Sequence, residues 1–217
     1  VRAGECLGLY GFVGAGHQEL VQALAGARPI DHGELRLDNR PVTIRRVSDA
    51  VHRGMVLVAA DRARTVVRGA TIARNVTLAH LTRSVGRWIT RGKEAKVTRP
   101  LLERVGCRPP DPDKLAGQLS GGNQQKVVLA KWLLGPIHVL LLEEPTRGMD
   151  VHAKAEVMRL VAEQQALGAA VILASTEPEM LLAYAQRIVT FSRGRLTREF
   201  VGQTVTKAQL MHAAELE

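Results

Sequence analysis

The sequence has 217 residues, of which 46% are hydrophobic, a content typical of a globular chain that buries one substantial core. No apolar run approaches the ~20 residues of a membrane-spanning helix. The formal net charge is +9, but the basic residues are scattered and only 3% of residues are aromatic, unlike the interleaved pattern of single-strand nucleic-acid binders. The composition argues against a nucleic-acid partner, and an anionic ligand or a membrane-side partner explains the charge as well.

Strand-sized apolar runs alternate along the chain with amphipathic stretches of helical length. The runs, rich in valine, leucine and isoleucine, lie at residues 5–10, 33–37, 55–59, 139–142, 170–174 and 188–191. The clearest helical stretches are residues 17–25, 151–167 and 178–184. Strands that are apolar throughout and alternate with helices predict a mostly parallel sheet covered on both faces. The predicted fold class is therefore α/β.

The middle of the chain differs from its ends. Residues 61–134 have helical patterns, an arginine-rich loop and little strand signal, so we expect an α-helical subdomain inserted into a core made of residues 1–60 and 135–217. Cys6 and Cys107 match no metal or disulfide spacing, which indicates a reducing compartment. The chain starts at Val1 with neither an initiating methionine nor a signal-peptide pattern, and we interpret it as one domain cut from a longer protein.

A glycine loop, "GFVGAGHQEL" at residues 11–20, follows the first apolar run. Gly11, Gly14 and Gly16 have the spacing at which backbone N–H groups turn toward an anion at a helix N-terminus. The phosphate-loop pattern G-x-x-x-x-G-K-[ST] then requires lysine and serine or threonine, but this chain has His17 and Gln18. Taken alone, the loop is equally compatible with a tight strand-to-helix turn.

Two glutamates end a later apolar run, in "LEEPTRGMD" at residues 142–150. In phosphate-loop ATPases an acidic residue at such a strand end holds magnesium through water, and a following carboxylate can orient the attacking water. Glu143 and Glu144 occupy those places. The alternative is a pair of solvated glutamates, although the E-P-T-x-G-x-D continuation has no obvious packing reason.

A third motif, "LSGGNQQK" at residues 119–126, opens a helical stretch. Ser120 is a natural N-cap, and Gly121 and Gly122 leave backbone N–H groups uncovered, so the helix start is a second anion site. The alternative is an ordinary capping loop, which would not require eight residues in this order.

In this order, with a helical insertion between the first and second, "GFVGAG", "LSGGNQQK" and "LLEEPTRGMD" resemble the ATP-binding subunits of ABC transporters over essentially the whole chain. "LSGGNQQK" with "EPTRGMDVHAKAEV" is similar to the C-terminal half of the fused, two-domain ATPases of bacterial sugar importers, in which the phosphate loop commonly departs from consensus. The resemblance implies an ABC-type nucleotide-binding domain with a phosphate-loop ATPase core, and ATP and magnesium as cofactors.

The resemblance also implies residue roles. Glu144 would be the catalytic carboxylate, Glu143 would hold magnesium in place of the usual aspartate, and Asp150 would contact the opposite subunit. Gln18 stands where a hydroxyl normally ligates magnesium. The other nucleotide-binding positions would be Gly11, Gly14, Ala15, Gly16 and His17 in the phosphate loop, Ser120, Gly121, Gly122, Asn123 and Gln124 in the signature motif, and Thr176 at the switch-histidine position.

Four departures from the family pattern fall at one site. His17 replaces a permanent cation and, with a reference pKa near ~6.5, is largely neutral at pH 7. Gln18 removes the hydroxyl, Ala60 stands at the glutamine-loop position, and Thr176 replaces the switch histidine. The signature motif is intact, so the resemblance predicts an asymmetric head-to-tail pair in which this chain completes the active site of its partner.

The resemblance further implies permease subunits, indirectly a solute-binding protein, and a peripheral location on the cytoplasmic face of the inner membrane. A monosaccharide or related small solute is the expected cargo. Three alternatives stay open: a nucleoside importer ATPase, a soluble ABC-type ATPase acting on RNA or DNA, and a scaffold that never binds nucleotide.

Overall fold

The computed structural model describes residues 1–61, 65–81, 85–86, 88–202 and 205–215. Its contacts divide the chain into two compact units. The first consists of Val1–Leu57, His138–Glu144 and Gln165–Glu217, and the second of Val58–Ile137 and Pro145–Gln164.

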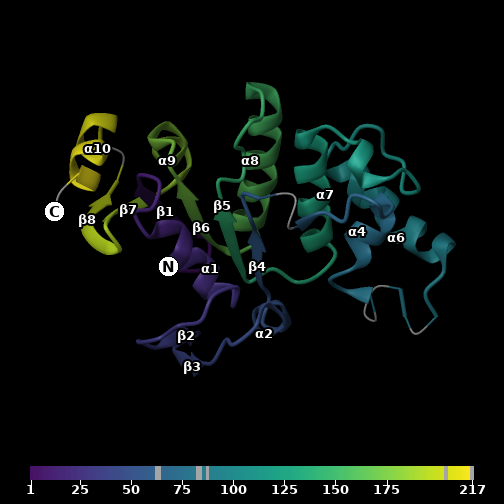
Figure 1. Ribbon diagram of the computed structural model, residues 1–217, viewed down its shortest axis with the longest axis horizontal. Helices are drawn as coiled ribbons and strands as arrows, with labels where there is room; N and C mark the ends of the chain where they lie inside the picture. The colour runs from purple at the N-terminus through teal and green to yellow at the C-terminus, as the bar shows by residue number, and fades with distance from the viewer. Residues whose placement is uncertain (62–64, 82–84, 87, 203–204, 216–217) are drawn as a thin grey trace. The chain divides into compact units, whose positions relative to one another are not determined.

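The first unit is built on a six-stranded sheet in the order β4-β5-β6-β1-β7-β8 (Figure 1). The strands are β1 (Cys6–Gly11), β4 (Met55–Val58), β5 (Val139–Glu143), β6 (Ala170–Ser175), β7 (Arg187–Ser192) and β8 (Arg195–Val201). β1 pairs in parallel with β6 and β7, and β5 pairs in parallel with β6. The prediction of an α/β fold with a mostly parallel sheet is confirmed. The sequence pattern does not predict β8, because this antiparallel edge strand is mostly exposed and lacks a continuous apolar run.

Helices cover both faces of this sheet. On one face α1 (His17–Leu24) packs its Val21 against the core cluster that includes Leu9, Leu141 and Phe191. Gly8, the neighbour of Leu9 in β1, points to the other face, where α9 (Pro178–Tyr184) and α10 (Lys207–Glu215) lie. Since both faces are covered, the central strands can be apolar throughout.

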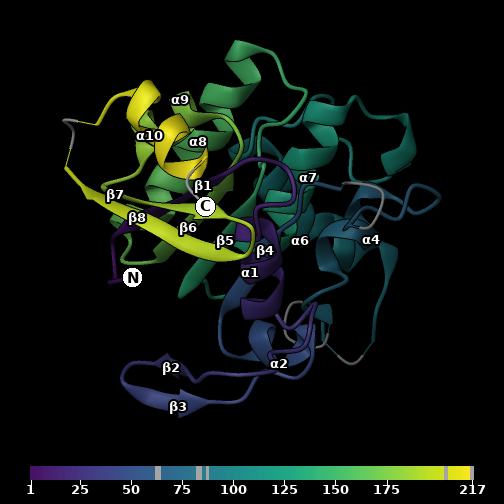
Figure 2. The ribbon, with the colours of Figure 1, turned by 60° about the vertical axis from the view of Figure 1, so that its left-hand side comes forward.

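A small second sheet lies on the α1 side of the main sheet (Figure 2). It pairs β2 (Leu35–Leu37) with β3 (Arg40–Val42), and α2 (Val47–His52) follows. The turn residues Asp38 and Asn39 both have positive φ, 49° and 60°, as a two-residue hairpin turn requires. The sequence pattern does not predict β3, because this strand is only three residues long and mostly exposed.

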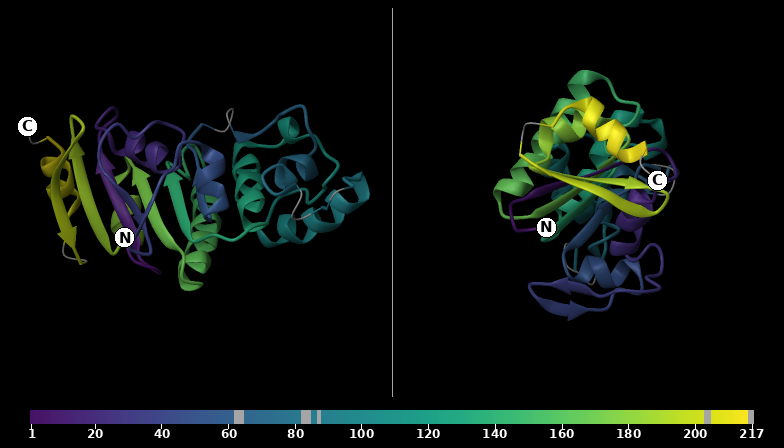
Figure 3. Two further views of the ribbon diagram at one scale, coloured as in Figure 1. Left: turned by 90° about the horizontal axis from the view of Figure 1, so that it is seen from below. Right: turned by 90° about the vertical axis from the view of Figure 1, so that its left-hand side faces the viewer.

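The second unit is helical. It contains α4 (Ile72–Thr77), α6 (Arg91–Arg104), a 3-10 turn at Ala116–Gln118, α7 (Gly121–Leu133) and most of α8 (Val151–Ala166). α4, α6 and α7 pack on one another, as the blue and teal helices of Figure 3 show. Part of the predicted helical segment and its arginine-rich loop, at 62–64, 82–84 and 87, lies outside the described residues. The unit also takes in residues 145–164, so the expected division at residues 61–134 stays a prediction.

Lys131 is a buried cation on α7. Its residue is 7% exposed, and its Nζ donates a 2.6 Å hydrogen bond to the carbonyl oxygen of Thr65. Burial lowers the pKa of Lys131 to about 8, because the charged ammonium is poorly solvated inside the helical unit.

This pKa predicts a stability that depends on pH. Between about pH 8 and 10.5 the unfolded chain holds a proton that the folded chain has released, so Lys131 makes the free energy of unfolding rise by up to about 3 kcal/mol across this interval. Urea unfolding at several pH values should show that Lys131→Met removes this rise, whereas the exposed control Lys96→Met keeps it. An unchanged slope in Lys131→Met would contradict the prediction.

Candidate functional site

The glycine loop joins β1 to α1 in the first unit. Gly11 ends β1 and His17 begins α1, as the sequence predicts for a phosphate-binding loop. Gly14 and Gly16 have φ of +83° and +103°, a backbone region that favours glycine. The loop is closed by the backbone bond from Ala15 N to the carbonyl of Phe12, 2.9 Å. The glycine spacing therefore produces the tight turn at a helix N-terminus that anion binding requires.

The turn between β7 and β8 supports this loop. Gly194 donates its backbone N–H to the carbonyl of Ala15, 2.9 Å. A Cβ added to Gly16 would lie 2.9 Å from the Cα of Gly194, so only glycine allows the two turns to approach this closely. Arg193 and Gly194 themselves have positive φ, 48° and 78°. The shape of the loop is thus fixed by contacts within the protein.

His17 points into the interior of the loop. The residue is 1% exposed, and its ring centroid lies 6.4 Å from that of Phe191. A Cβ on Gly11 would lie 2.8 Å from the His17 Nδ1, which places the ring directly against the start of the loop. Neither ring nitrogen has a hydrogen-bond partner among the described residues. Burial lowers the pKa of His17, and the charges of Glu144 and Glu19 oppose this only in part, so the ring is neutral at pH 7.

The carboxylate of Glu144 is held from three sides. It accepts hydrogen bonds from the Ser175 hydroxyl (2.9 Å), the Thr176 backbone N–H (2.5 Å) and the Gln18 side-chain amide (3.5 Å). The residue is 5% exposed and has φ of +43°, and its own N–H donates to the carbonyl of Ala174. Both carboxylate oxygens are therefore engaged by the protein.

Glu143 is also buried and accepts a 2.9 Å hydrogen bond from the Gln22 amide. Its oxygens are of the type that magnesium prefers, but Gln18 offers a neutral amide that is turned to Glu144. Residues 11–18 include no lysine or arginine, so two buried carboxylates have no cation from this loop. The residues fit the phosphates of a nucleotide only through backbone N–H groups and fit magnesium only in part.

Two residues of this cluster were not singled out from the sequence, Ser175 and Gln22. Ser175 ends β6 beside the end of β5, and the carboxyl ends of adjacent parallel strands meet at one sheet edge. The position of Ser175 at the end of β6 is the sequence signal that could have identified it. Thr176 contributes its backbone N–H here, and Ala60 is half-buried in the bend after β4.

The signature residues line a separate pocket of about 420 Å³, which lies within the second unit. Ser120 caps α7, its hydroxyl accepting from the Asn123 N–H at 3.5 Å and the Asn123 side-chain amide at 3.0 Å. Asp150 caps α8 by accepting from the Ala153 N–H at 2.9 Å, and such backbone donors lower the pKa of Asp150. The pocket brings Ser120, Gly121, Gly122, Asn123 and Asp150 together. Gln124 instead donates to its own segment, to the carbonyls of Ala116 and Leu119.

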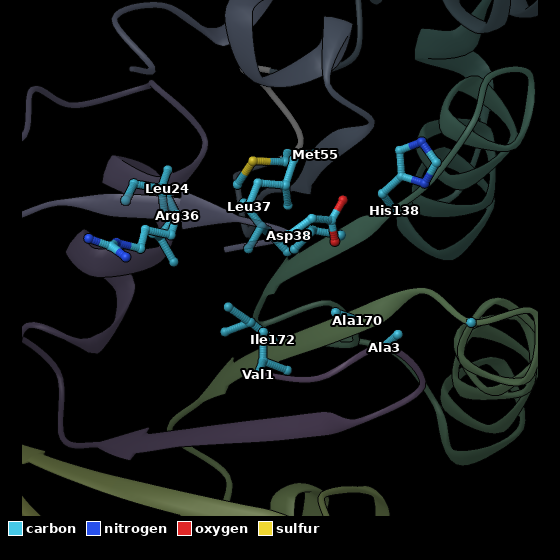
Figure 4. A pocket seen from close by; sticks show the side chains of 14 residues that line it. Val1, Ala3, Leu24, Arg36, Leu37, Asp38, Met55, His138, Ala170 and Ile172 are labelled. Atoms are coloured by element: carbon cyan, nitrogen blue, oxygen red, sulfur yellow. The ribbon is translucent and has the colours of Figure 1, made fainter. Parts of the chain in front are cut away.

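An apolar cavity of about 470 Å³ lies beside the sheet in the first unit (Figure 4). Leu37 and Met55 lie on one side of it, and Ala170 and Ile172 on the other. Its polar side chains are those of Arg36, Asp38 and His138. In the described part of the chain there is neither a group of three or more metal-ligating side chains nor a helix long and apolar enough to span a membrane.

The fold and the motifs define the class of protein. The family model described as "ABC transporter" matches residues 1–147, and the chain belongs to this family. The chain is 41% identical over 221 residues to a xylose import ATP-binding protein of Burkholderia ambifaria, with 99% of the chain and 42% of that protein covered. It is 39% identical over 214 residues to a ribose import ATP-binding protein of Rhodopirellula baltica, with 97% and 42% covered. The chain thus spans about two fifths of the length of these relatives.

Solved structures agree on the fold. The chain matches cbiO1 of Clostridium perfringens, part of the ABC transporter complex cbiONQ, with a TM-score of 0.73, 25% identity, and coverage of 92% of this chain and 78% of that one. A bacterial ABC transporter cassette solved as a dimer matches with a TM-score of 0.78 and 20% identity, covering 93% and 87%. The phosphate-loop ATPase fold predicted from the sequence is therefore confirmed.

The inward position of His17 predicts that Gly11 is irreplaceable. In Gly11→Ala the new methyl group would meet the Ala15 Cβ at 2.7 Å and the His17 ring at 2.8 Å, and we expect the free energy of unfolding to fall by about 1–3 kcal/mol. Gly92, in the first turn of α6, has open space around an added Cβ, so Gly92→Ala should be neutral or stabilising. Urea denaturation checks both, and equal stabilities of the two variants would contradict the geometry.

Proposed function

We propose that this chain is the second, C-terminal nucleotide-binding domain of a fused ABC importer ATPase. Its phosphate loop does not support ATP hydrolysis, and its signature motif completes the active site of the partner domain. The observation that carries the proposal is the contrast between the buried Glu144, whose carboxylate is bonded to Ser175, Thr176 and Gln18, and the exposed Ser120 at the signature pocket.

At the phosphate loop two features oppose hydrolysis. The neutral His17 ring lies inside the loop and offers no charge to a phosphate. The Glu144 carboxylate, in the place of the catalytic carboxylate, uses both oxygens on Ser175, Thr176 and Gln18. A base that orients an attacking water needs a free oxygen within hydrogen-bond reach of that water. This arrangement supports a site that keeps its shape and binds nucleotide weakly or holds it intact.

The signature pocket supports the opposite role. Ser120 is exposed, and Gly121 and Gly122 are only half-buried at the first turn of α7. Backbone N–H groups at a helix N-terminus, together with a hydroxyl, favour an anion. ATP with magnesium, held by the partner domain, supplies the phosphoanhydride bond that the transporter cleaves. Ser120, Gly121 and Gly122 would bind its terminal phosphate, and Asp150 would face the partner.

We further propose a monosaccharide such as a pentose as the cargo. The relatives described above are named for xylose and ribose import, and they are more than twice as long as this chain. A two-domain ATPase of this kind would act with permease subunits at the cytoplasmic face of the inner membrane and, through them, with a solute-binding protein.

Turnover of the assembled transporter tests the division of labour. Ser120→Arg fills the signature pocket and should reduce ATP hydrolysis to background, because the partner site is left incomplete. Glu144→Gln should leave turnover near the parent value, since Ser175 can reverse its hydroxyl and preserve the contact. The isolated domain should be nearly inactive. Robust hydrolysis by the isolated domain, or loss of turnover in Glu144→Gln, would sink the asymmetric assignment.

Uptake measurements test the cargo. Cells that express the complete transporter should accumulate radiolabelled ribose or xylose, and Ser120→Arg in this chain should abolish the accumulation. Labelled nucleosides serve as the comparison, since a nucleoside importer is the alternative within the family. Uptake of nucleosides without uptake of pentoses would reject the monosaccharide assignment.

A further inference from the structure

We propose that Arg108 is a further phosphate-binding residue of the signature pocket and that Asn123 positions it. The ligand would be the terminal phosphate of a nucleoside triphosphate held by the partner domain. This inference rests on the proposed function, because it assumes that the pocket faces a nucleotide in the partner.

Arg108 lies in the loop that follows α6 and lines the same 420 Å³ pocket as Ser120 and Asp150. Its side chain is exposed. The guanidinium makes no hydrogen bond or ion pair with any residue in the described part of the chain. Arg108 is thus a cation at the rim of the pocket whose five N–H donors remain available to a ligand.

The backbone around Arg108 is held in place although its side chain is free. The Arg108 N–H donates to the Asn123 Oδ1 at 2.9 Å, and the Asn123 Nδ2 donates to the Ser120 hydroxyl at 3.0 Å. Lys126 Nζ donates to the carbonyl of Gly106 at 2.9 Å. One asparagine side chain therefore connects the capping serine of the signature motif to the backbone of Arg108.

The acidic side chains that line the pocket already have hydrogen-bond or ion-pair partners within the protein. Asp150 accepts from the first turn of α8, and Glu156 forms an ion pair with Lys126. Lys126 lowers the pKa of Glu156, with smaller contributions from His152 and Arg108, so the carboxylate stays ionised and bound to the lysine. Arg108 therefore acts on Glu156 only at a distance and forms no ion pair with any described residue, in a pocket toward which α7 and α8 both direct their N-termini.

An anion with several oxygens is the ligand that this arrangement fits. A guanidinium binds phosphate through two parallel N–H groups, and such charge-assisted bonds are stronger than neutral ones. Ser120 and the N–H groups of the two glycines would take the remaining oxygens. The contact would involve the terminal phosphate alone, so Arg108 would distinguish a triphosphate from a diphosphate.

Steady-state ATP hydrolysis by the assembled transporter tests the proposal. Arg108→Ala should raise the KM for magnesium-ATP about tenfold, the loss expected for one charge-assisted contact, while inhibition by ADP stays unchanged. Arg108→Lys should restore part of the affinity, because lysine keeps the positive charge but cannot donate two parallel N–H groups. Arg104→Ala is the matched control: this arginine ends α6, pairs with Glu163 outside the pocket, and should leave the KM unchanged.

Asn123→Ala should raise the KM as Arg108→Ala does, and the double variant should be no worse than either single one. Thermal unfolding should show no change in Arg108→Ala, because the guanidinium has no internal partner. A parent-like KM in Arg108→Ala, or an equal loss of ADP inhibition, overturns the role of Arg108, and additive effects overturn that of Asn123. If Ser120→Arg stops turnover and Arg108→Ala does not raise the KM, only this inference fails. If Ser120→Arg leaves ATP turnover unchanged, the proposed function fails together with this inference.

Discussion

A buried carboxylate needs hydrogen-bond donors, and at Glu144 this requirement organises one edge of the sheet in the first unit. The end of β6 supplies Ser175 and Thr176, and α1 supplies Gln18. Removing donors would leave a charge in a poorly solvated place, which costs several kcal/mol. The contacts that stabilise Glu144 also occupy its oxygens. The bonds that stabilise the buried carboxylate therefore use the same lone pairs that a catalytic base would need.

The two candidate sites differ in where their polar groups are satisfied. In the first unit Glu143, Glu144 and Gln18 bond to neighbours within a few ångströms. In the second unit the internal bonds of Asn123, Lys126 and Glu156 build the walls of the pocket, and the guanidinium of Arg108 remains at its rim. This difference agrees with the proposed division of labour, in which the groups of the second site gain their ligand only when the partner domain binds.

The sequence predicts the features that depend on residues close to one another in the chain. The continuous apolar runs of β5 and β6 identified buried parallel strands, and the glycine spacing identified a loop in which Gly14 and Gly16 have positive φ. It did not find the inward ring of His17 or the bond from Ser175 to Glu144. Those depend on which side chains the sheet edge brings together, and Ser175 lies 31 residues from Glu144 in the chain. The same holds for Asn123 and Arg108, which sit 15 residues apart.

The two-residue turn of Arg193 and Gly194 presses against the phosphate loop from a distant part of the chain. Gly194 binds the carbonyl of Ala15 and lies against Gly16, so this hairpin turn helps to set the curvature of the phosphate loop. An inserted residue in the turn would push Gly194 into Gly16. The length of the hairpin between β7 and β8 is therefore a constraint on a loop that lies more than 170 residues away in the chain.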